Sequence, residues 1–439
     1  MDKREYARRR KRLMDMVDTG GIAIQPTAPE RVRNRDVYYP FRPDSDFHYL
    51  TGFPEPEAVL VMVPDRPQGE CILFCREKDP EAETWHGRRV GLEGACELYG
   101  ADDAFPISDL DDILPGLLEN KERIYYTMGR YQEFDQRLMG WLNRVSSKGR
   151  AGVHTPDQFN SLAHYVHEMR LYKSREEIKV MRRAAQIAAV AHRRAMEACQ
   201  PGMYEYQIEA ELLHSFIQQG ARSPAYPCIV GGGANTCILH YTENNDPLKD
   251  GDLLLIDAGA ELDSYASDVT RTFPVNGRFT PEQQAIYEIV LESQQAAIAA
   301  VRPGNGWDDP HQAAVEVITK GLIDVGILKG RWRTLVKEGA YRPYYMHRTG
   351  HWLGMDVHDV GDYKVGDEWR TFEPGMVTTV EPGLYLSPAL KGLAKRWWNI
   401  GIRIEDDVLV TTDGHEVLSA GAPKTIDEIE LTMRQASAA

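Results

Sequence analysis

The sequence predicts an α+β protein with two domains. A mixed α/β domain is expected over residues 1–173, and a second domain over residues 174–439, in which helices pack on a curved, largely antiparallel sheet. Three observations support this prediction. The 439 residues exceed the roughly 150 of a typical domain, a strong helix-start signal stands at Ser174, and strand-like runs alternate with long helices after it.

The first domain is expected to contain both helices and strands. Its charged opening segment predicts a helix over Lys3–Met16, and short apolar runs predict strands over Ala58–Val63 and Cys71–Phe74. A short helix is predicted over Ser108–Leu114, because Pro115 follows it and cannot donate a backbone hydrogen bond.

Two other segments of this domain are interpreted from their composition. The basic run from Arg8 to Arg12 is typical of a solvated helix face. The aromatic stretch Tyr38–Phe53 contains two prolines and a glycine, so it is expected to form loops and turns. Neither segment contains a catalytic cluster.

The second domain begins with a capped helix. Ser174, followed three residues later by Glu177, forms a capping-box pattern, and the helix is expected to end at about Cys199. Further helices are predicted over Glu205–Gln219 and Pro281–Val301, each ending before a glycine or proline. The segments between and after these helices are strand-like.

The composition excludes several classes of protein. Apolar residues make up 42% and charged residues 27%, as in folded globular proteins. The net charge of -15, from 51 basic and 66 acidic residues, disfavours nucleic acid and anionic lipid as partners. No apolar run approaches the roughly 18 residues that span a bilayer, and the six cysteines lack C-x-x-C spacing. A cytoplasmic protein with reduced thiols is expected.

Two aspartates at strand ends are the first candidate site residues. Asp257 ends the buried-looking strand that begins at Asp252, and Asp268 follows inside a second strand-like run. A turn near residues 261–264 lays these segments antiparallel, so the two carboxylates face each other. Such carboxylates repel one another unless a cation lies between them.

Three more residues complete the candidate metal set. His351, Glu381 and Glu405 each lie in or beside a strand-like segment, and imidazole favours transition metals. By the two-residue period of a strand, Arg403 and Glu405 share one face. One such carboxylate alone is usually a turn or cap residue, but four carboxylates and a histidine together are able to hold two divalent ions.

The motifs in this order resemble the pita-bread metallopeptidases. The motifs are Ile256-Asp257-Ala258-Gly259, the run Ser267–Pro274, Gly350-His351-x-Leu-Gly354, Glu381-Pro-Gly and Arg403-Ile-Glu405-Asp406. In the first domain, the run Ser45–Pro56 is further similar to bacterial aminopeptidase P. The resemblance covers essentially the whole chain and implies a pita-bread second domain, with a first domain that serves oligomerisation and part of the substrate access.

The resemblance assigns roles to the metal set. Asp257 would bind one ion, Asp268 and Glu405 would bridge both ions, and His351 and Glu381 would complete the other shell. Manganese is the expected metal, with cobalt or zinc as alternatives. A metal-bridged hydroxide would attack the peptide carbonyl, and Glu381 would also carry the proton to the leaving nitrogen.

Further residues match positions that line the family's site. By resemblance, the residues that would bind the substrate or its tetrahedral intermediate are His240, His347, His358 and Tyr385. Arg403 would orient Asp257 or the substrate, Thr270 would hydrogen-bond a carboxylate of the metal set, and Trp85 would reach a neighbouring subunit's site. Taken alone, each histidine is more often a satisfied surface or core residue, and Trp85 an ordinary core residue. Arg348 departs from the usual pattern, so the pocket near His347 is expected to be narrower or more positive. The run Trp397–Asn399 also departs from it, which leaves the preferred substrate length open.

The implied reaction is hydrolysis of the N-terminal Xaa-Pro peptide bond by a metalloaminopeptidase. The expected partners are peptides with proline at the second position and further copies of the chain, in a dimer or homotetramer. A prolidase that acts on Xaa-Pro dipeptides uses the same metal set and stays open. A non-catalytic peptide-binding module or a creatinase-like enzyme without metal is disfavoured, because all five metal positions are retained.

Overall fold

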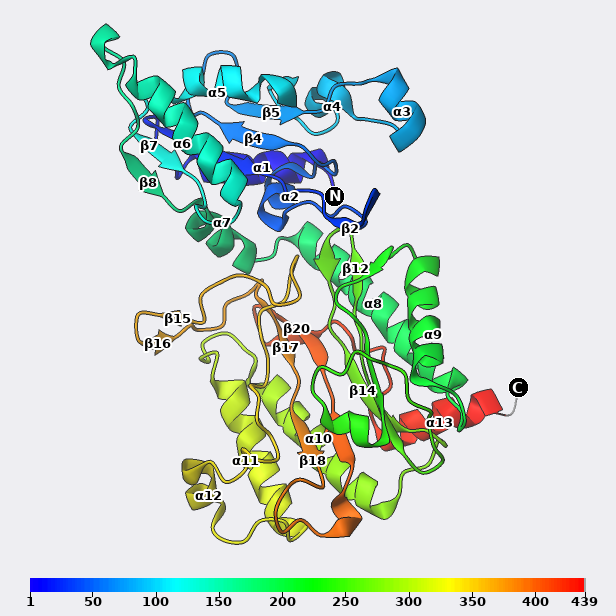
Figure 1. Ribbon diagram of the computed structural model, residues 1–439. Helices are drawn as coiled ribbons and strands as arrows, with labels where there is room; N and C mark the ends of the chain where they lie inside the picture. The colour runs from blue at the N-terminus through cyan, green and yellow to red at the C-terminus, as the bar shows by residue number, and fades with distance from the viewer. Residues whose placement is uncertain (438–439) are drawn as a thin grey trace. The chain divides into compact units, whose positions relative to one another are not determined.

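The computed structural model describes residues 1–437 (Figure 1). The chain forms two compact units, which divide between Arg170 and Leu171, beside the predicted boundary at residue 173. Each unit has its own hydrophobic core.

The first unit is built on a mixed six-stranded sheet in the order β6-β5-β4-β1-β7-β8. Its strands are β1 (Gly21–Pro26), β4 (Val59–Met62), β5 (Cys71–Cys75), β6 (Asp103–Pro106), β7 (Arg123–Tyr125) and β8 (Gln158–Asn160), with a separate hairpin of β2 (Val32–Asn34) and β3 (Val37–Tyr38). Its helices are α1 (Lys3–Met14), α2 (Ser45–Thr51), α3 (Pro80–His86), α4 (Gly91–Glu97), α5 (Leu110–Leu118), α6 (Gln132–Ser146) and α7 (Leu162–Leu171). Apolar residues of α5 and α6 pack on the sheet. The predicted opening helix and both predicted strands are confirmed.

The predicted end of the helix before Pro115 is wrong. Helix α5 continues through Pro115 to Leu118. A proline inside a helix leaves the carbonyl four residues earlier without its usual donor. Here that carbonyl belongs to Asp111, and the Arg144 guanidinium of α6 donates a hydrogen bond to it at 2.5 Å. The tertiary partner therefore satisfies the carbonyl and the helix continues.

The interpretations of the aromatic stretch and the basic run are also corrected. The stretch contains helix α2, which Asp44 caps by accepting a hydrogen bond from the Phe47 backbone. Arg9 and Arg10 are buried rather than solvated, and their guanidinium groups donate to carbonyl oxygens of Tyr49 and Leu50 at the end of α2. The two arginines thus satisfy the carbonyls that a helix end leaves free.

In the second unit every strand pair among the described residues is antiparallel. The strands are β9 (Ser223–Pro224), β10 (Ile229–Gly232), β11 (Leu253–Asp257), β12 (Ala260–Leu262), β13 (Tyr265–Ala266), β14 (Thr270–Pro274), β15 (Lys364–Val365), β16 (Glu368–Trp369), β17 (Val377–Val380), β18 (Gly383–Leu386), β19 (Ile400–Arg403), β20 (Asp406–Val410) and β21 (His415–Val417). The helices are α8 (Arg175–Ala198), α9 (Glu205–Gln218), α10 (Pro281–Ala300), α11 (Asp309–Asp324), α12 (Trp332–Glu338) and α13 (Ile426–Ser437). The predicted antiparallel sheet is confirmed.

The helices of the second unit border the strands and share one core with them (Figure 1). Helix α8 begins with the predicted capping box, in which Ser174 and Glu177 exchange hydrogen bonds. In β11, Leu253, Leu254 and Ile256 belong to the core shared with the helices, while Leu255 belongs to a smaller separate cluster. From Leu254 onward the side chains alternate, and this alternation directs Asp257 away from the helix core, which leaves its carboxylate available for a site.

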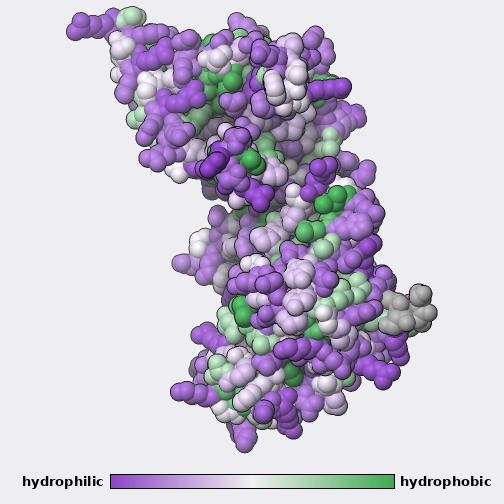
Figure 2. Space-filling view, turned by 45° about the vertical axis from the view of Figure 1, so that its right-hand side comes forward, coloured by the Kyte–Doolittle hydropathy of each residue, from purple (hydrophilic) through white to green (hydrophobic). Residues whose placement is uncertain are grey.

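The surface is largely polar. Figure 2 shows one face on which hydrophilic residues predominate and apolar residues form only small patches between them. Among residues 1–437, no helix combines the length and the apolar character needed to cross a bilayer.

Candidate active site

A pocket of about 410 Å³ in the second unit collects most of the residues that the sequence indicated. Nine of them line it: His240, Asp257, Asp268, His347, His351, His358, Glu381, Arg403 and Glu405. They come from segments that are distant in the sequence, and the antiparallel strands bring their ends together.

Asp257 and Asp268 are positioned by a chain reversal. Strand β11 pairs with β14, with Asp257 opposite Thr270, and the turn between β12 and β13 is formed by Asp263 and Ser264, both with positive φ. Glycine is required at position 259, two residues after Asp257, because a Cβ atom there would lie 1.7 Å from the Ser267 carbonyl oxygen. The predicted antiparallel arrangement with a turn in this region is confirmed.

Tyr226 joins the two aspartates and was missed from the sequence. Its hydroxyl forms hydrogen bonds with Asp257 Oδ1 at 2.6 Å and with Asp268 Oδ1 at 2.5 Å. Burial and the neighbouring carboxylates raise the pKa of Tyr226 well above its ordinary value, so it is a neutral donor. No charge pattern or spacing around Tyr226 indicates this contact, because it depends on the fold.

His351 presents one ring nitrogen to the carboxylates. Its Nδ1 lies 3.0 Å from the Trp352 carbonyl oxygen, which only accepts, so Nδ1 carries the proton. Its Nε2 lies 3.3 Å from Asp268 Oδ2 and 3.8 Å from Glu381 Oε1. A histidine held through one nitrogen in this way directs the other nitrogen at a metal.

Glu405 lies beside this pair. Ligand atoms of Asp268, His351 and Glu405 all lie within 4.8 Å of one another, close enough to share one ion. Thr270 donates a hydrogen bond from Oγ1 to Glu405 Oε2 at 2.6 Å. The predicted hydrogen bond of Thr270 with a carboxylate of the candidate metal set is thus confirmed.

Arg403 is the buried cation of the site. It donates from Nη2 to Asp257 Oδ2 at 2.7 Å, from Nη1 to the Tyr385 hydroxyl at 3.0 Å, and from Nε to Thr270 Oγ1 at 3.2 Å. The two neighbours of Arg403 in the chain, Ile402 and Ile404, are buried in the core shared with the helices, as the two-residue period of a strand predicts.

The electrostatics of the pocket favour added cations. Burial raises the pKa of Glu381 to about 7 and the pKa of Glu405 well above its ordinary value. Burial lowers the pKa of His351, but Asp268 and Glu381 outweigh it and raise this pKa to about 9. Four carboxylates thus compete for one arginine and one protonated histidine. A mixed oxygen and imidazole donor set of this charge fits divalent transition metals, which displace protons from their ligands.

The remaining histidines lie at the pocket wall. Burial lowers the pKa of His347 to about 3, so the ring is neutral. Its Nδ1 donates to the Arg348 carbonyl at 2.7 Å, and its Nε2 lies 2.9 Å from the Tyr385 hydroxyl. The ring of His358 packs edge-on against His351, with centroids 4.3 Å apart, and His240 is exposed.

Tyr385, Trp85 and Arg348, the other residues that the sequence singled out, differ in how buried they are. Tyr385 is buried behind the wall and reaches the site through its hydroxyl. Trp85 lies on α3 of the first unit and is 78% exposed, so the core alternative is wrong. Arg348 lines the pocket, but its guanidinium pairs with Asp308 and lies over Trp307, which reduces the extra positive charge expected near His347.

Comparison with known proteins identifies the family. The profile of Metallopeptidase family M24 matches residues 179–412, and that of the aminopeptidase P N-terminal domain matches residues 6–125. The chain belongs to metallopeptidase family M24. All nine predicted residues that line the pocket lie within the segment that matches the M24 profile.

Relatives of this M24 chain match over its full length. It is 46% identical to the Xaa-Pro aminopeptidase of Escherichia coli over 434 residues, 99% of this chain and 98% of the relative. The structure of Pseudomonas aeruginosa aminopeptidase PepP matches with 57% identity and a TM-score of 0.99, over 100% of this chain and 99% of that one. A zinc-substituted E. coli aminopeptidase P in complex with product matches with 46% identity and a TM-score of 0.97, over 99% of each chain.

These matches confirm several predictions. The resemblance to bacterial aminopeptidase P, the α+β fold with a pita-bread domain, and the assignment as a metalloaminopeptidase of the Xaa-Pro aminopeptidase type are all confirmed. The M24 chain is therefore a metal-dependent hydrolase.

Proposed function

We propose that this M24 enzyme uses two divalent ions, manganese first and cobalt or zinc as alternatives, to remove an N-terminal residue that precedes proline. The convergence of Asp268, His351 and Glu405 ligand atoms within 4.8 Å is the observation that carries this proposal. Asp257 would hold one ion, Glu381 and His351 the other, and Asp268 and Glu405 would lie between them. Such ions lower the pKa of a water molecule and stabilise negative charge on a carbonyl oxygen.

Residues of the chain would then manage the substrate and the proton. Glu381, which lines the pocket, would take the proton of the attacking water and return it to the leaving nitrogen. His240 and His358, at the wall, would hydrogen-bond the substrate carbonyl and the tetrahedral intermediate. Arg403 keeps Asp257 in place through the 2.7 Å contact.

The pocket suits a proline after the scissile bond. The nitrogen of an Xaa-Pro bond carries no proton, so a site for it needs a wall that accepts a ring rather than an acceptor for an N–H. Apolar side chains of Pro227, Ile229, Leu239 and Val357 line the pocket together with the histidines. His347 and Tyr385 would bind the substrate on the remaining side, where their hydrogen bond fixes both groups.

A peptide-release assay tests this function and separates it from prolidase activity. The protein would be stripped of metal, reloaded with Mn²⁺, Co²⁺ or Zn²⁺, and assayed with an Xaa-Pro dipeptide, an Xaa-Pro-Xaa tripeptide and an Xaa-Ala-Xaa control. Cleavage of the tripeptide, dependent on added metal and absent for the alanine control, is expected. Cleavage of the dipeptide alone would favour prolidase, and full activity without metal would overturn the proposal.

We also propose a cytoplasmic homo-oligomer, a dimer or homotetramer, in which residues 1–173 take part in assembly and substrate access and residues 174–439 in catalysis. The 78% exposure of Trp85 supports a role for this side chain at a neighbouring subunit's site. Light scattering of the purified protein gives the assembly state. Trp85→Ala is expected to weaken binding of longer peptides, and unchanged KM values would contradict this role.

A further inference from the structure

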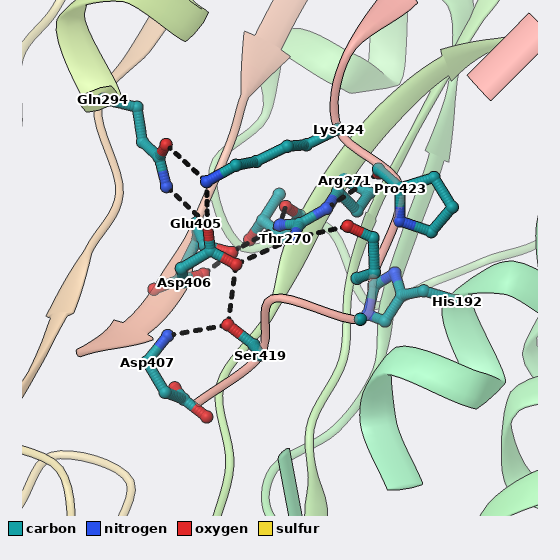
Figure 3. A network of polar contacts seen from close by, with 12 residues as sticks. His192, Thr270, Arg271, Gln294, Glu405, Asp406, Asp407, Ser419, Pro423 and Lys424 are labelled. Atoms are coloured by element: carbon teal, nitrogen blue, oxygen red, sulfur yellow. Dashed lines mark hydrogen bonds and ion pairs between the residues drawn. The ribbon is translucent and has the colours of Figure 1, made fainter. Parts of the chain in front are cut away.

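A buried polar network reaches Glu405, one of the residues that line the pocket (Figure 3). Its centre is Arg271, a fully buried residue of β14. Arg271 donates to the carbonyl oxygens of Thr270 at 2.9 Å, Glu405 at 2.6 Å, Ala422 at 3.2 Å and Pro423 at 3.0 Å, and to Asp406 Oδ1 at 2.7 Å. The five donor hydrogens of the guanidinium group therefore all have acceptors.

Asp406 is the anion of this network and is also fully buried. Besides Arg271, it accepts hydrogen bonds from Ser419 Oγ at 2.6 Å, Gln294 Nε2 at 2.8 Å and Lys424 Nζ at 2.7 Å. A buried carboxylate with two cations and two neutral donors is held in one orientation.

The network fixes Glu405 at its backbone. The Glu405 N–H donates to the Thr270 carbonyl at 3.1 Å, and the Glu405 carbonyl accepts from Arg271 at 2.6 Å. Together with the Thr270 hydroxyl on the carboxylate, these contacts hold the residue at three points. The direction of the Glu405 carboxylate therefore depends on Arg271.

A second branch reaches Asp268. Ser419 Oγ, which donates to Asp406, accepts from the Asp407 N–H at 3.1 Å. The Asp407 carboxylate in turn accepts from the Asp268 N–H, at 3.1 and 3.3 Å to its two oxygens. The two carboxylates proposed to lie between the ions are thus both tied to Asp406.

The C-terminal segment 419–424 supplies much of this network, although it lies beyond residues 179–412, the part that matches the M24 profile. We propose that Arg271, Asp406 and Lys424 are positioning residues that hold Glu405 and Asp268 in the geometry that binds metal. Segment 419–424 then belongs to the support of the site. This inference rests on the proposed metal function.

Lys424→Met tests the inference with the full-length protein. The variant keeps the length of a side chain that is 22% exposed but removes its charge from Asp406. The Mn²⁺ affinity of each protein would be measured by competition with a chromogenic chelator and by calorimetry. Residues behind metal ligands commonly change affinity by 10- to 100-fold, so a loss of about tenfold is expected. Lys424→Arg is expected to stay within about threefold of the parent.

The control is Lys320→Met on α11, where an exposed lysine pairs with Glu316. Its Mn²⁺ affinity is expected to equal that of the parent. Since positioning acts through metal binding, excess Mn²⁺ should restore most of the kcat of Lys424→Met. If its affinity stays unchanged while the metal-free protein melts at a lower temperature, the network only stabilises the fold and the inference is wrong.

Three further outcomes are decisive. If Lys424→Met does not fold, Ser419→Ala replaces it, with an expected loss of about threefold in Mn²⁺ affinity, and an unchanged affinity overturns the inference. If the parent protein binds no divalent ion at all, the proposed function fails and the inference fails with it. If the parent binds ions and the variants bind them equally well, only the inference fails.

Discussion

Arg403→Met should destabilise the second unit strongly in the metal-free protein. The substitution removes the 2.7 Å contact with Asp257 and the contacts with Tyr385 and Thr270. Methionine fills a similar volume, so the change removes charge and hydrogen bonds rather than packing. The Arg403 side chain is 4% exposed and Asp257 is 12% exposed, so water replaces little of what is lost.

The magnitude follows from this burial. Removing one partner of a buried ion pair costs about 3 to 5 kcal/mol, because the other charge is left without compensation. Asp257 keeps its hydrogen bond with Tyr226 and can take up a proton, so the lower end, about 3 kcal/mol, is expected. For a unit of this size, about 2 °C of melting temperature per kcal/mol predicts a decrease of about 6 °C.

Thermal melts of metal-free protein at neutral pH would measure this effect. Arg182→Met is the matched control, because Arg182 forms an equally close pair with Glu416, with both side chains more than a third exposed. Exposed pairs contribute at most about 1 kcal/mol, so the control should melt within about 2 °C of the parent. Equal effects of the two variants would refute the claim that Arg403 compensates buried carboxylates.

Three other predictions follow from the same structure. Glu381→Gln should abolish nearly all peptide release while circular dichroism stays unchanged, and normal turnover would exclude its proton-transfer role. Asp268→Ala should lose at least one bound metal, and elemental analysis that still finds two ions per chain would contradict its bridging position. Burial lowers the pKa of His192 to about 4, so the unfolded chain takes up a proton between pH 6.5 and 4 that the folded chain does not. The free energy of unfolding should therefore fall as pH falls through this window, by up to about 3 kcal/mol from this residue. Denaturant melts over the same pH range should show a smaller loss of unfolding free energy for His192→Gln than for the parent.

Local features of the sequence were sufficient for three of the six helices in the described part of the second unit. The capping box at Ser174 depends on residues three apart, and the breakers after each helix act on adjacent residues, so α8, α9 and α10 end within a residue of their predicted ends. The same holds for strand periodicity, which placed Ile402 and Ile404 in the core.

Features that depend on distant partners were mispredicted or missed. Helix α5 continues past Pro115, and Arg144 of another helix donates to the carbonyl that the proline leaves free. Arg9 and Arg10 are buried only because the end of α2 offers them carbonyl oxygens. In each case the local sequence favoured the opposite outcome, and a tertiary hydrogen bond reversed it.

The sequence by itself determined which side chains are candidates for the chemistry of this M24 enzyme, because carboxylates at the ends of apolar strands are unfavourable unless a site uses them. Only the tertiary structure decided how these side chains are held. Tyr226 between the two aspartates and the Arg271 network behind Glu405 connect residues far apart in the chain, through single hydrogen bonds that leave no periodic pattern in the sequence. Hydrogen bonds require atoms within about 3 Å of one another, and that proximity exists only once the strands have paired.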